Sequence, residues 1–163
     1  NGGISRYKKF EYLLTNILQK PIKKQELSEL LSNFSKEVKQ ALLVCEVATD
    51  IKELRDKTRN TKWLIVSGGD QAELREVFKQ RNLDGYFDGG IFGSPDDKDT
   101  ILKNEMDTLN ITGRCLFLGD SMYDYQAAIT AQMNFVFISQ WTEVVDWEDK
   151  FTNNTRPNLS SLL

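Results

Sequence analysis

Histidine is absent from the 163 residues of this chain, and cysteine occurs only twice. Without histidine the chain cannot build a Ser-His-Asp triad, a Cys-His nucleophile pair or a histidine-ligated zinc site. Any acid–base or metal chemistry must therefore use carboxylates. No apolar run reaches 18 residues, and no basic segment followed by an apolar one opens the sequence at Asn1. We therefore expect neither a membrane-spanning helix nor a signal peptide in these residues.

Positive charge is not in excess either. The 21 Lys and Arg residues against 24 Asp and Glu give a net charge of −3, so the composition does not indicate nucleic acid as the main partner. Cys45 and Cys115 each lie in an apolar stretch and are expected to be buried, reduced thiols. We therefore expect a cytoplasmic protein that has no nucleic-acid or membrane partner.

The length suits one domain, or one domain with a small appendage. The pattern changes near residue 58, which predicts a helical part over 1–58 and an α/β part over 59–163. Apolar residues recur at steps of three and four over 4–18 and again over 27–45, which predicts a pair of helices joined by a short link at Lys20-Pro21. Asp50 is expected to cap a short third helix.

From residue 60 onward, short apolar runs alternate with helical spacing. The expected strands cover 63–66, 86–87 with 90–93, 115–118 and 135–138, and the expected helices cover 71–80, 97–109 and 122–132. Such alternation predicts a parallel sheet covered by helices on both faces. Ligands in these folds bind beyond the carboxyl ends of the strands, so the residues at those ends are the candidates for a site.

The first candidate is the turn expected at Ser67-Gly68-Gly69, before the helix over 71–80. A hydroxyl and free backbone N–H groups at a helix N-terminus suit an anion. The same residues also suit ordinary turn and capping chemistry, which is the simpler interpretation of this segment alone.

The second candidate is Lys98, which opens the helix over 97–109. A cation at a helix N-terminus opposes the helix dipole, so its presence there needs a reason. It could neutralise a phosphate or a carboxylate nucleophile, or it could be a solvated surface lysine.

The third candidate is the pair Asp120 and Asp124, at the end of a strand and one turn into the next helix. Two carboxylates so close repel each other unless a cation lies near them. Oxygen ligands without histidine or cysteine suit Mg²⁺. The alternative is a helix cap at Asp120 with a first-turn acid at Asp124.

The three candidates follow one another as a serine, a lysine and an acidic pair, each at or just past a strand end of the same expected sheet. With this order the chain resembles the haloacid dehalogenase (HAD) superfamily, most of whose members are Mg²⁺-dependent phosphatases. Ser67 matches its second motif, Lys98 its third, and Gly119-Asp120 with Asp124 its fourth. The stretches 66–71 and 83–88 resemble the phosphoglycolate-phosphatase-like branch. Residues 4–58 resemble the small helical cap of that branch, which opens here at Gly2-Gly3-Ile4. The resemblance implies a HAD-like Rossmannoid α/β core.

The first motif of that family, Asp-x-Asp-x-Thr/Val after an apolar strand, has no match in these residues. In the family it supplies the nucleophilic Asp and the general-acid Asp, and its strand lies in the middle of the parallel sheet. We therefore expect that a central strand is missing here, that residues upstream of Asn1 are absent from the sequence, and that these 163 residues have essentially no phosphatase turnover.

The resemblance also implies roles for individual residues. Ser67 and the Gly68 amide would hold phosphate oxygens, and Lys98 would offset negative charge. Asp120 would ligate Mg²⁺, and Asp124 would ligate it or hold its waters. The remaining candidates are the cations Arg6 and Lys9, which could contact a small phosphorylated metabolite or could be solvated helix charges.

Three other interpretations stay open at the level of sequence. The chain could be a non-catalytic HAD-like binding module, a carbon–halogen hydrolase, or the C-terminal phosphatase domain of a larger bifunctional enzyme. The acidic pair favours the phosphotransferase over the halogen hydrolase. The sequence indicates neither the substrate nor the oligomeric state.

Overall fold

The computed structural model describes residues 5–151 and 154–163. Gly2, Gly3 and Ile4, expected at the opening of the cap, lie outside the described residues. The described residues group into two compact units, one made of 5–46 with 64–97 and the other of 47–63 with 98–151 and 154–163. The predicted division of the chain into a helical part over 1–58 and an α/β part over 59–163 stays a prediction.

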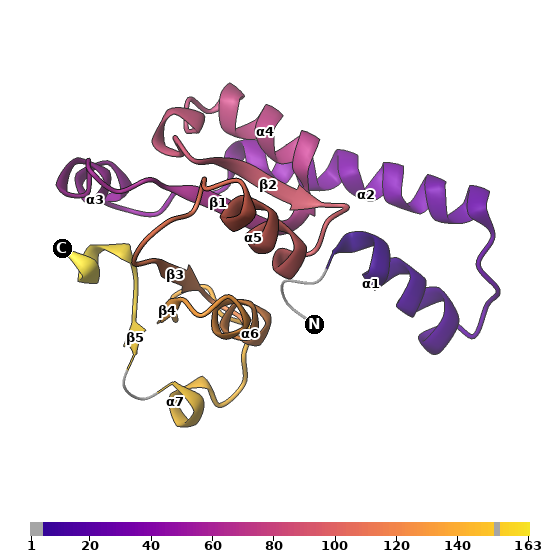
Figure 1. The fold of residues 1–163 in the computed structure, drawn as a ribbon. Helices are drawn as coiled ribbons and strands as arrows, with labels where there is room; N and C mark the ends of the chain where they lie inside the picture. The colour runs from indigo at the N-terminus through magenta and orange to yellow at the C-terminus, as the bar shows by residue number, and fades with distance from the viewer. Residues whose placement is uncertain (1–4, 152–153) are drawn as a thin grey trace. The chain divides into compact units, whose positions relative to one another are not determined.

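The first unit begins with the expected pair of helical segments. They are α1 (Arg6–Tyr12), which continues as the π-helical turn η1 (Leu13–Ile17), and α2 (Lys24–Val44) (Figure 1). Ser5 caps α1, because its hydroxyl accepts a 3.4 Å hydrogen bond from the Lys8 N–H. The Phe10 and Phe34 rings pack edge to face between α1 and α2, with centroids 5.3 Å apart.

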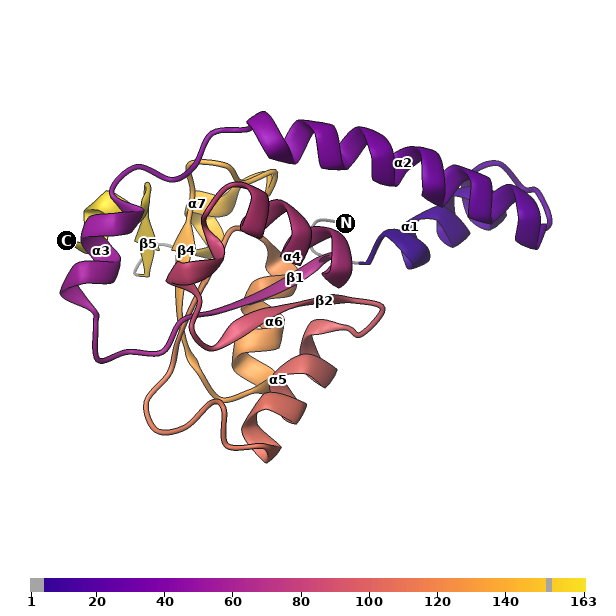
Figure 2. The ribbon, with the colours of Figure 1, turned by 90° about the horizontal axis from the view of Figure 1, so that it is seen from above.

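The same unit also contains β1 (Leu64–Asp70), α4 (Gln71–Gln80), the 3₁₀ turn η2 (Asp84–Tyr86) and β2 (Gly90–Ser94). The two strands are parallel, and α4 packs on both of them (Figure 2). Leu74 and Val77 are its buried apolar side chains, and Ile91 of β2 is buried as well. The predicted strand at Tyr86-Phe87 is wrong, because the chain turns at η2 and becomes extended only at Gly90.

The second unit contains α3 (Ile51–Lys57), α5 (Lys98–Asp107), β3 (Leu116–Gly119), α6 (Met122–Thr130), β4 (Asn134–Ile138), α7 (Trp147–Lys150), β5 (Thr155–Arg156) and the 3₁₀ turn η3 (Leu159–Leu162). The parallel strands lie in the order β3-β4-β5, and α6 packs against β3 and β4. The core centres on Phe137, which is fully buried and stacks on Phe151 with centroids 4.3 Å apart.

The predicted α/β class with parallel strands and flanking helices is confirmed, but the strands form two sheets where the sequence suggested one. Within the described residues β1 pairs only with β2, and β3 and β5 are the two edges of the other sheet. Ser67, Gly68 and Gly69 also differ from the expected turn, because they continue β1 as an irregular strand.

The structure also bears on three smaller expectations. Asp50 does not cap α3: it has φ 62°, and its carboxylate accepts a 2.7 Å hydrogen bond from the Ser160 hydroxyl instead. Both cysteines are free thiols as expected, but Cys45 is exposed and Cys115 only partly buried. Over 5–151 and 154–163, no helix combines the length and apolar character that crossing a bilayer requires.

Candidate active site

Ser67, Gly68 and Gly69 form the irregular part of β1, and Asp70 ends that strand directly before α4. The Ser67 hydroxyl oxygen accepts a 3.1 Å hydrogen bond from the Gly69 N–H. Asp70 caps α4, since its Oδ1 accepts from the Glu73 N–H at 3.0 Å. A helix cap at Asp70 and the polar segment 67–69, called the loop below, are therefore both present and adjacent in the chain.

The end of β2 supports this loop from the side. The Ser94 hydroxyl, only 1% exposed, donates a 2.8 Å hydrogen bond to the Gly68 carbonyl. Gly93 lies so close that a Cβ atom there would come within 2.3 Å of the Gly69 carbonyl oxygen. Neither Gly93 nor Ser94 was expected to have a role, and nothing in their local sequence signals one.

Lys98 is the first residue of α5 and is only 5% exposed, so its interpretation as a solvated surface lysine is wrong. Its Nζ forms an ion pair with Asp124 Oδ1, and it lies 5.6 Å from the centre of the Tyr123 ring. The structure therefore brings together two of the predicted site residues within the second unit. The buried Asp124 carboxylate therefore stabilises the charge of Lys98 at a position where the helix dipole opposes a cation.

Asp124 is held on its other side by the start of α6. Its Oδ2 accepts hydrogen bonds from the Ser121 N–H (3.2 Å) and the Ser121 hydroxyl (2.6 Å), in a capping box. Both carboxylate oxygens of Asp124 are thus engaged by protein donors. Ser121 was not among the predicted site residues, although the Ser-x-x-Asp spacing is a recognisable local signal.

Asp120 follows β3 directly and is exposed. Partial desolvation of its carboxyl group nevertheless raises the pKa of Asp120 above its ordinary value, and the negative charge of Asp124 raises it further. A carboxylate whose ionised form is disfavoured gains from a bound cation, so Asp120 fits a Mg²⁺ ligand. Asp124 fits less well as a direct ligand, because Lys98 and Ser121 occupy its oxygens. Among the described residues, no three His, Cys, Asp or Glu side chains gather as a metal site would need.

Arg6 and Lys9 differ sharply from each other in α1. Arg6 is 8% exposed and donates two hydrogen bonds to Glu73 of α4, at 2.8 and 2.9 Å. Lys9 is exposed. Contact of either residue with a substrate stays a prediction, and Arg6 has two of its nitrogens committed to the protein. Glu73 was not among the predicted site residues, because its partner lies 67 positions away in the sequence.

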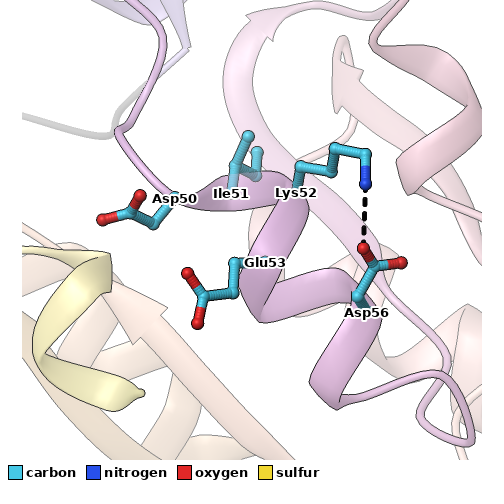
Figure 3. A pocket seen from close by; sticks show the side chains of 5 residues that line it. All are labelled: Asp50, Ile51, Lys52, Glu53 and Asp56. Carbon is cyan, nitrogen blue, oxygen red and sulfur yellow. Dashed lines mark hydrogen bonds and ion pairs between the residues drawn. The ribbon is translucent and has the colours of Figure 1, made fainter.

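A pocket opens elsewhere in the second unit, at the start of α3 (Figure 3). It is lined by Asp50, Ile51, Lys52, Glu53 and Asp56. None of these is a predicted site residue. Lys52 pairs with Asp56 at 2.9 Å and lowers the pKa of that carboxyl group, as expected for an exposed i,i+4 pair.

Comparison with solved structures shows what this arrangement resembles. A HAD hydrolase of family IA, variant 3, from Entamoeba histolytica is similar with a TM-score of 0.73 at 15% identity, over 96% of this chain and 79% of that one. A putative phosphatase from Clostridium difficile is similar with a TM-score of 0.68 at 13% identity, over 93% and 74%. At such identities the likeness shows the fold alone.

A phosphonoacetaldehyde hydrolase-like protein from Oleispira antarctica is similar with a TM-score of 0.67 at 15% identity, over 91% of this chain. The present chain spans 65% of that protein, which is less than two thirds of its length. No curated protein sequence matches the chain.

The family model for haloacid dehalogenase-like hydrolases matches residues 6–138. That span includes Ser67, Lys98, Asp120 and Asp124, and it covers most of the chain. The resemblance to the superfamily is therefore confirmed, whereas the phosphoglycolate-phosphatase-like branch stays a prediction. The chain belongs to the haloacid dehalogenase-like hydrolase family.

Proposed function

We propose that the chain is part of a Mg²⁺-dependent phosphoric monoester hydrolase that acts on a small phosphorylated metabolite. The observation that supports this most is the second-unit cluster of Lys98, Asp120 and Asp124. A buried lysine, a carboxylate that holds it and an open carboxylate with a raised pKa are a costly arrangement for stability alone.

Each residue has a proposed part in binding. The Ser67 hydroxyl and the Gly68 amide would hold phosphate oxygens. Lys98, oriented by Asp124, would offset negative charge on the phosphoryl group. Asp120 would hold Mg²⁺, which when bound would neutralise charge on that group. Lys9 is the cap residue that stays available to an acidic substrate.

The proposed reaction is carboxylate attack on phosphorus, which forms an aspartyl-phosphate and breaks the bond to the leaving alcohol. Water then cleaves the acyl phosphate and releases inorganic phosphate. The family's Asp-x-Asp-x-Thr/Val motif after an apolar strand does not occur in the printed residues. We therefore propose that residues 1–163 alone do not hydrolyse p-nitrophenyl phosphate, and Mg²⁺-dependent turnover by this chain would contradict that part.

The metal site can be tested by thermal unfolding during a Mg²⁺ titration. We expect a saturable rise in the melting temperature of the wild type and its loss in Asp120→Asn. Asp149→Asn, at an exposed acidic residue of α7, is the control and should respond like the wild type. A wild type that gives no saturable response would favour the non-catalytic binding module.

A cytoplasmic location also belongs to this proposal. It is supported by two cysteines that are free thiols in the structure.

A further inference from the structure

We propose that Ser94 is a positioning residue that orients the Ser67 hydroxyl for a phosphate oxygen. The inference rests on the proposed function, because it assigns a phosphate to residues 67–69 in the irregular part of β1. It adds a residue that lies outside the sequence motifs discussed above. Ser94 is almost fully buried, and its hydroxyl donates a hydrogen bond to the Gly68 carbonyl of the loop.

The need for this hydrogen bond arises from an irregular pairing of the two strands. Val66 pairs with Phe92, and the next pair is Asp70 with Ser94. Three residues of β1 (67–69) therefore lie opposite the single residue Gly93 of β2. Such a bulge takes backbone groups out of the regular ladder, and they need other partners. The Ser94 hydroxyl supplies one by donating to the Gly68 carbonyl at 2.8 Å.

One peptide group carries the effect from Ser94 to Ser67. The Gly68 carbonyl and the Gly69 N–H belong to the same planar trans peptide, so they point in opposite directions. With the carbonyl fixed by Ser94, the N–H donates to the Ser67 hydroxyl oxygen at 3.1 Å. An oxygen that accepts this bond keeps its own proton to donate, which is what an anionic phosphate oxygen requires.

Gly93 makes the close approach of the strands possible. A Cβ atom at this position would lie 2.3 Å from the Gly69 carbonyl oxygen and 3.3 Å from the Gln71 backbone nitrogen. Any side chain there would push the loop away from β2 and from the Ser94 hydroxyl. Ser94 and Gly93 therefore act on the same loop, one by bonding and the other by leaving space.

The experiment is a titration of inorganic phosphate, with Mg²⁺ in excess, into the ¹⁵N-labelled full chain, observed at the Gly68 and Gly69 amides. The variants are Ser94→Ala and Ser94→Cys, which keeps the volume and a weaker donor. Ser160→Ala, which removes the hydroxyl bonded to Asp50, is the matched control. We expect phosphate affinity to fall about two- to tenfold in Ser94→Ala, less in Ser94→Cys, and not at all in the control. The Gly69 amide of unliganded Ser94→Ala should also shift.

The outcomes separate the two proposals. If the wild type shows no phosphate-dependent shift at these amides, the phosphate-binding function fails, and the role of Ser94 fails with it. If the wild type binds and both Ser94 variants bind equally well, the positioning role is wrong while the proposed function stands. If Ser94→Ala does not fold, the comparison between wild type and Ser94→Cys decides, because an unchanged affinity there would also overturn the inference.

Discussion

Arg6 and Glu73 form a buried ion pair that joins α1 to α4 within the first unit. Their side chains are 8% and 5% exposed, and Ser35 of α2 donates a further 2.5 Å hydrogen bond to Glu73. Burial opposes the ionisation of Glu73, but hydrogen bonds from Arg6 and Ser35 and the charge of Arg6 outweigh it and lower the pKa of Glu73. The hydrogen bond to Glu73 likewise raises the pKa of Arg6. The Glu73 carboxylate therefore links α4 to both α1 and α2.

Removal of either partner should destabilise the chain, because the other is left as a buried, unpaired charge. We expect Arg6→Met to lower the free energy of unfolding by about 3–5 kcal/mol in urea titrations near neutral pH. The exposed pair of Lys8 and Asp97, 3.6 Å apart, provides the control, since Lys8→Met should cost less than about 1 kcal/mol. An equal loss of unfolding free energy in the two variants would show that the buried pair contributes no more to stability than the exposed pair.

The same ion pair gives a pH dependence with a definite sign. A carboxyl group whose pKa is lowered by folding stabilises the native state above its unfolded pKa, which is about 4.3 for glutamate. We expect this contribution to be present at neutral pH and to be lost as pH falls through the folded pKa of Glu73. In Glu73→Gln, that part of the acid-induced loss should be missing, whereas an unchanged acid profile would contradict the assignment.

Gly119 is needed at the end of β3 because Asp124 occupies the space of a side chain. A Cβ atom there would lie 2.3 Å from the Asp124 Cβ. We expect Gly119→Ala to destabilise the chain by about 1–3 kcal/mol and to weaken any Mg²⁺ response by displacing Asp124. Gly85→Ala, where a Cβ meets nothing within 4 Å, should change stability by less than about 0.5 kcal/mol in the same thermal unfolding assay. Identical effects of the two substitutions would refute this explanation.

At the scale of elements, β3 is an edge strand with an unusual amount of exposed apolar surface. Leu116 and Leu118 are 55% and 36% exposed, while Phe117 between them faces the core and packs beside Phe135. Within the described residues, β3 pairs only with β4. An edge of this kind is prone to pair with another chain.

We expect Leu116→Lys to reduce concentration-dependent association, measured by light scattering, because a charge on an edge strand opposes pairing. Leu109→Lys changes a leucine that is 74% exposed but lies outside the strands, and it should associate like the wild type. If Leu109→Lys has the same effect as Leu116→Lys, general charge and not the β3 edge governs association.

At the scale of the whole molecule, the net charge is the basis for an expectation about nucleic acid. The net charge of −3 and a sequence pI near 5.1 offer no surplus of cations to displace counterions from a polyphosphate backbone. We expect no saturable binding to labelled duplex DNA in anisotropy titrations near physiological salt. Saturable binding whose affinity falls steeply with salt would contradict the expectation that nucleic acid is not a partner.

Most elements were predictable because their signals are local. The spacing over 71–80 corresponds to α4 residue for residue, and the apolar runs that became β3 and β4 differ from the structure only by one residue at their ends. The first run begins β1, but that strand continues through 67–69, where a turn was expected. The exceptions have physical reasons. Residues 86–87 are apolar but turn with η2, and β5 is a strand of two residues whose pairing with β4 no sequence pattern marks.

The sequence by itself placed Ser67 and Asp120 directly after apolar runs and Lys98 at the start of a helix, because strand period and helix caps are encoded by near neighbours. Only the tertiary structure decided which partners those residues have. Lys98 meets Asp124 from 26 positions away, Ser94 meets Gly68 from 26, and Arg6 meets Glu73 from 67. Such pairings follow from how helices and strands pack, and packing leaves no periodic trace in a single sequence.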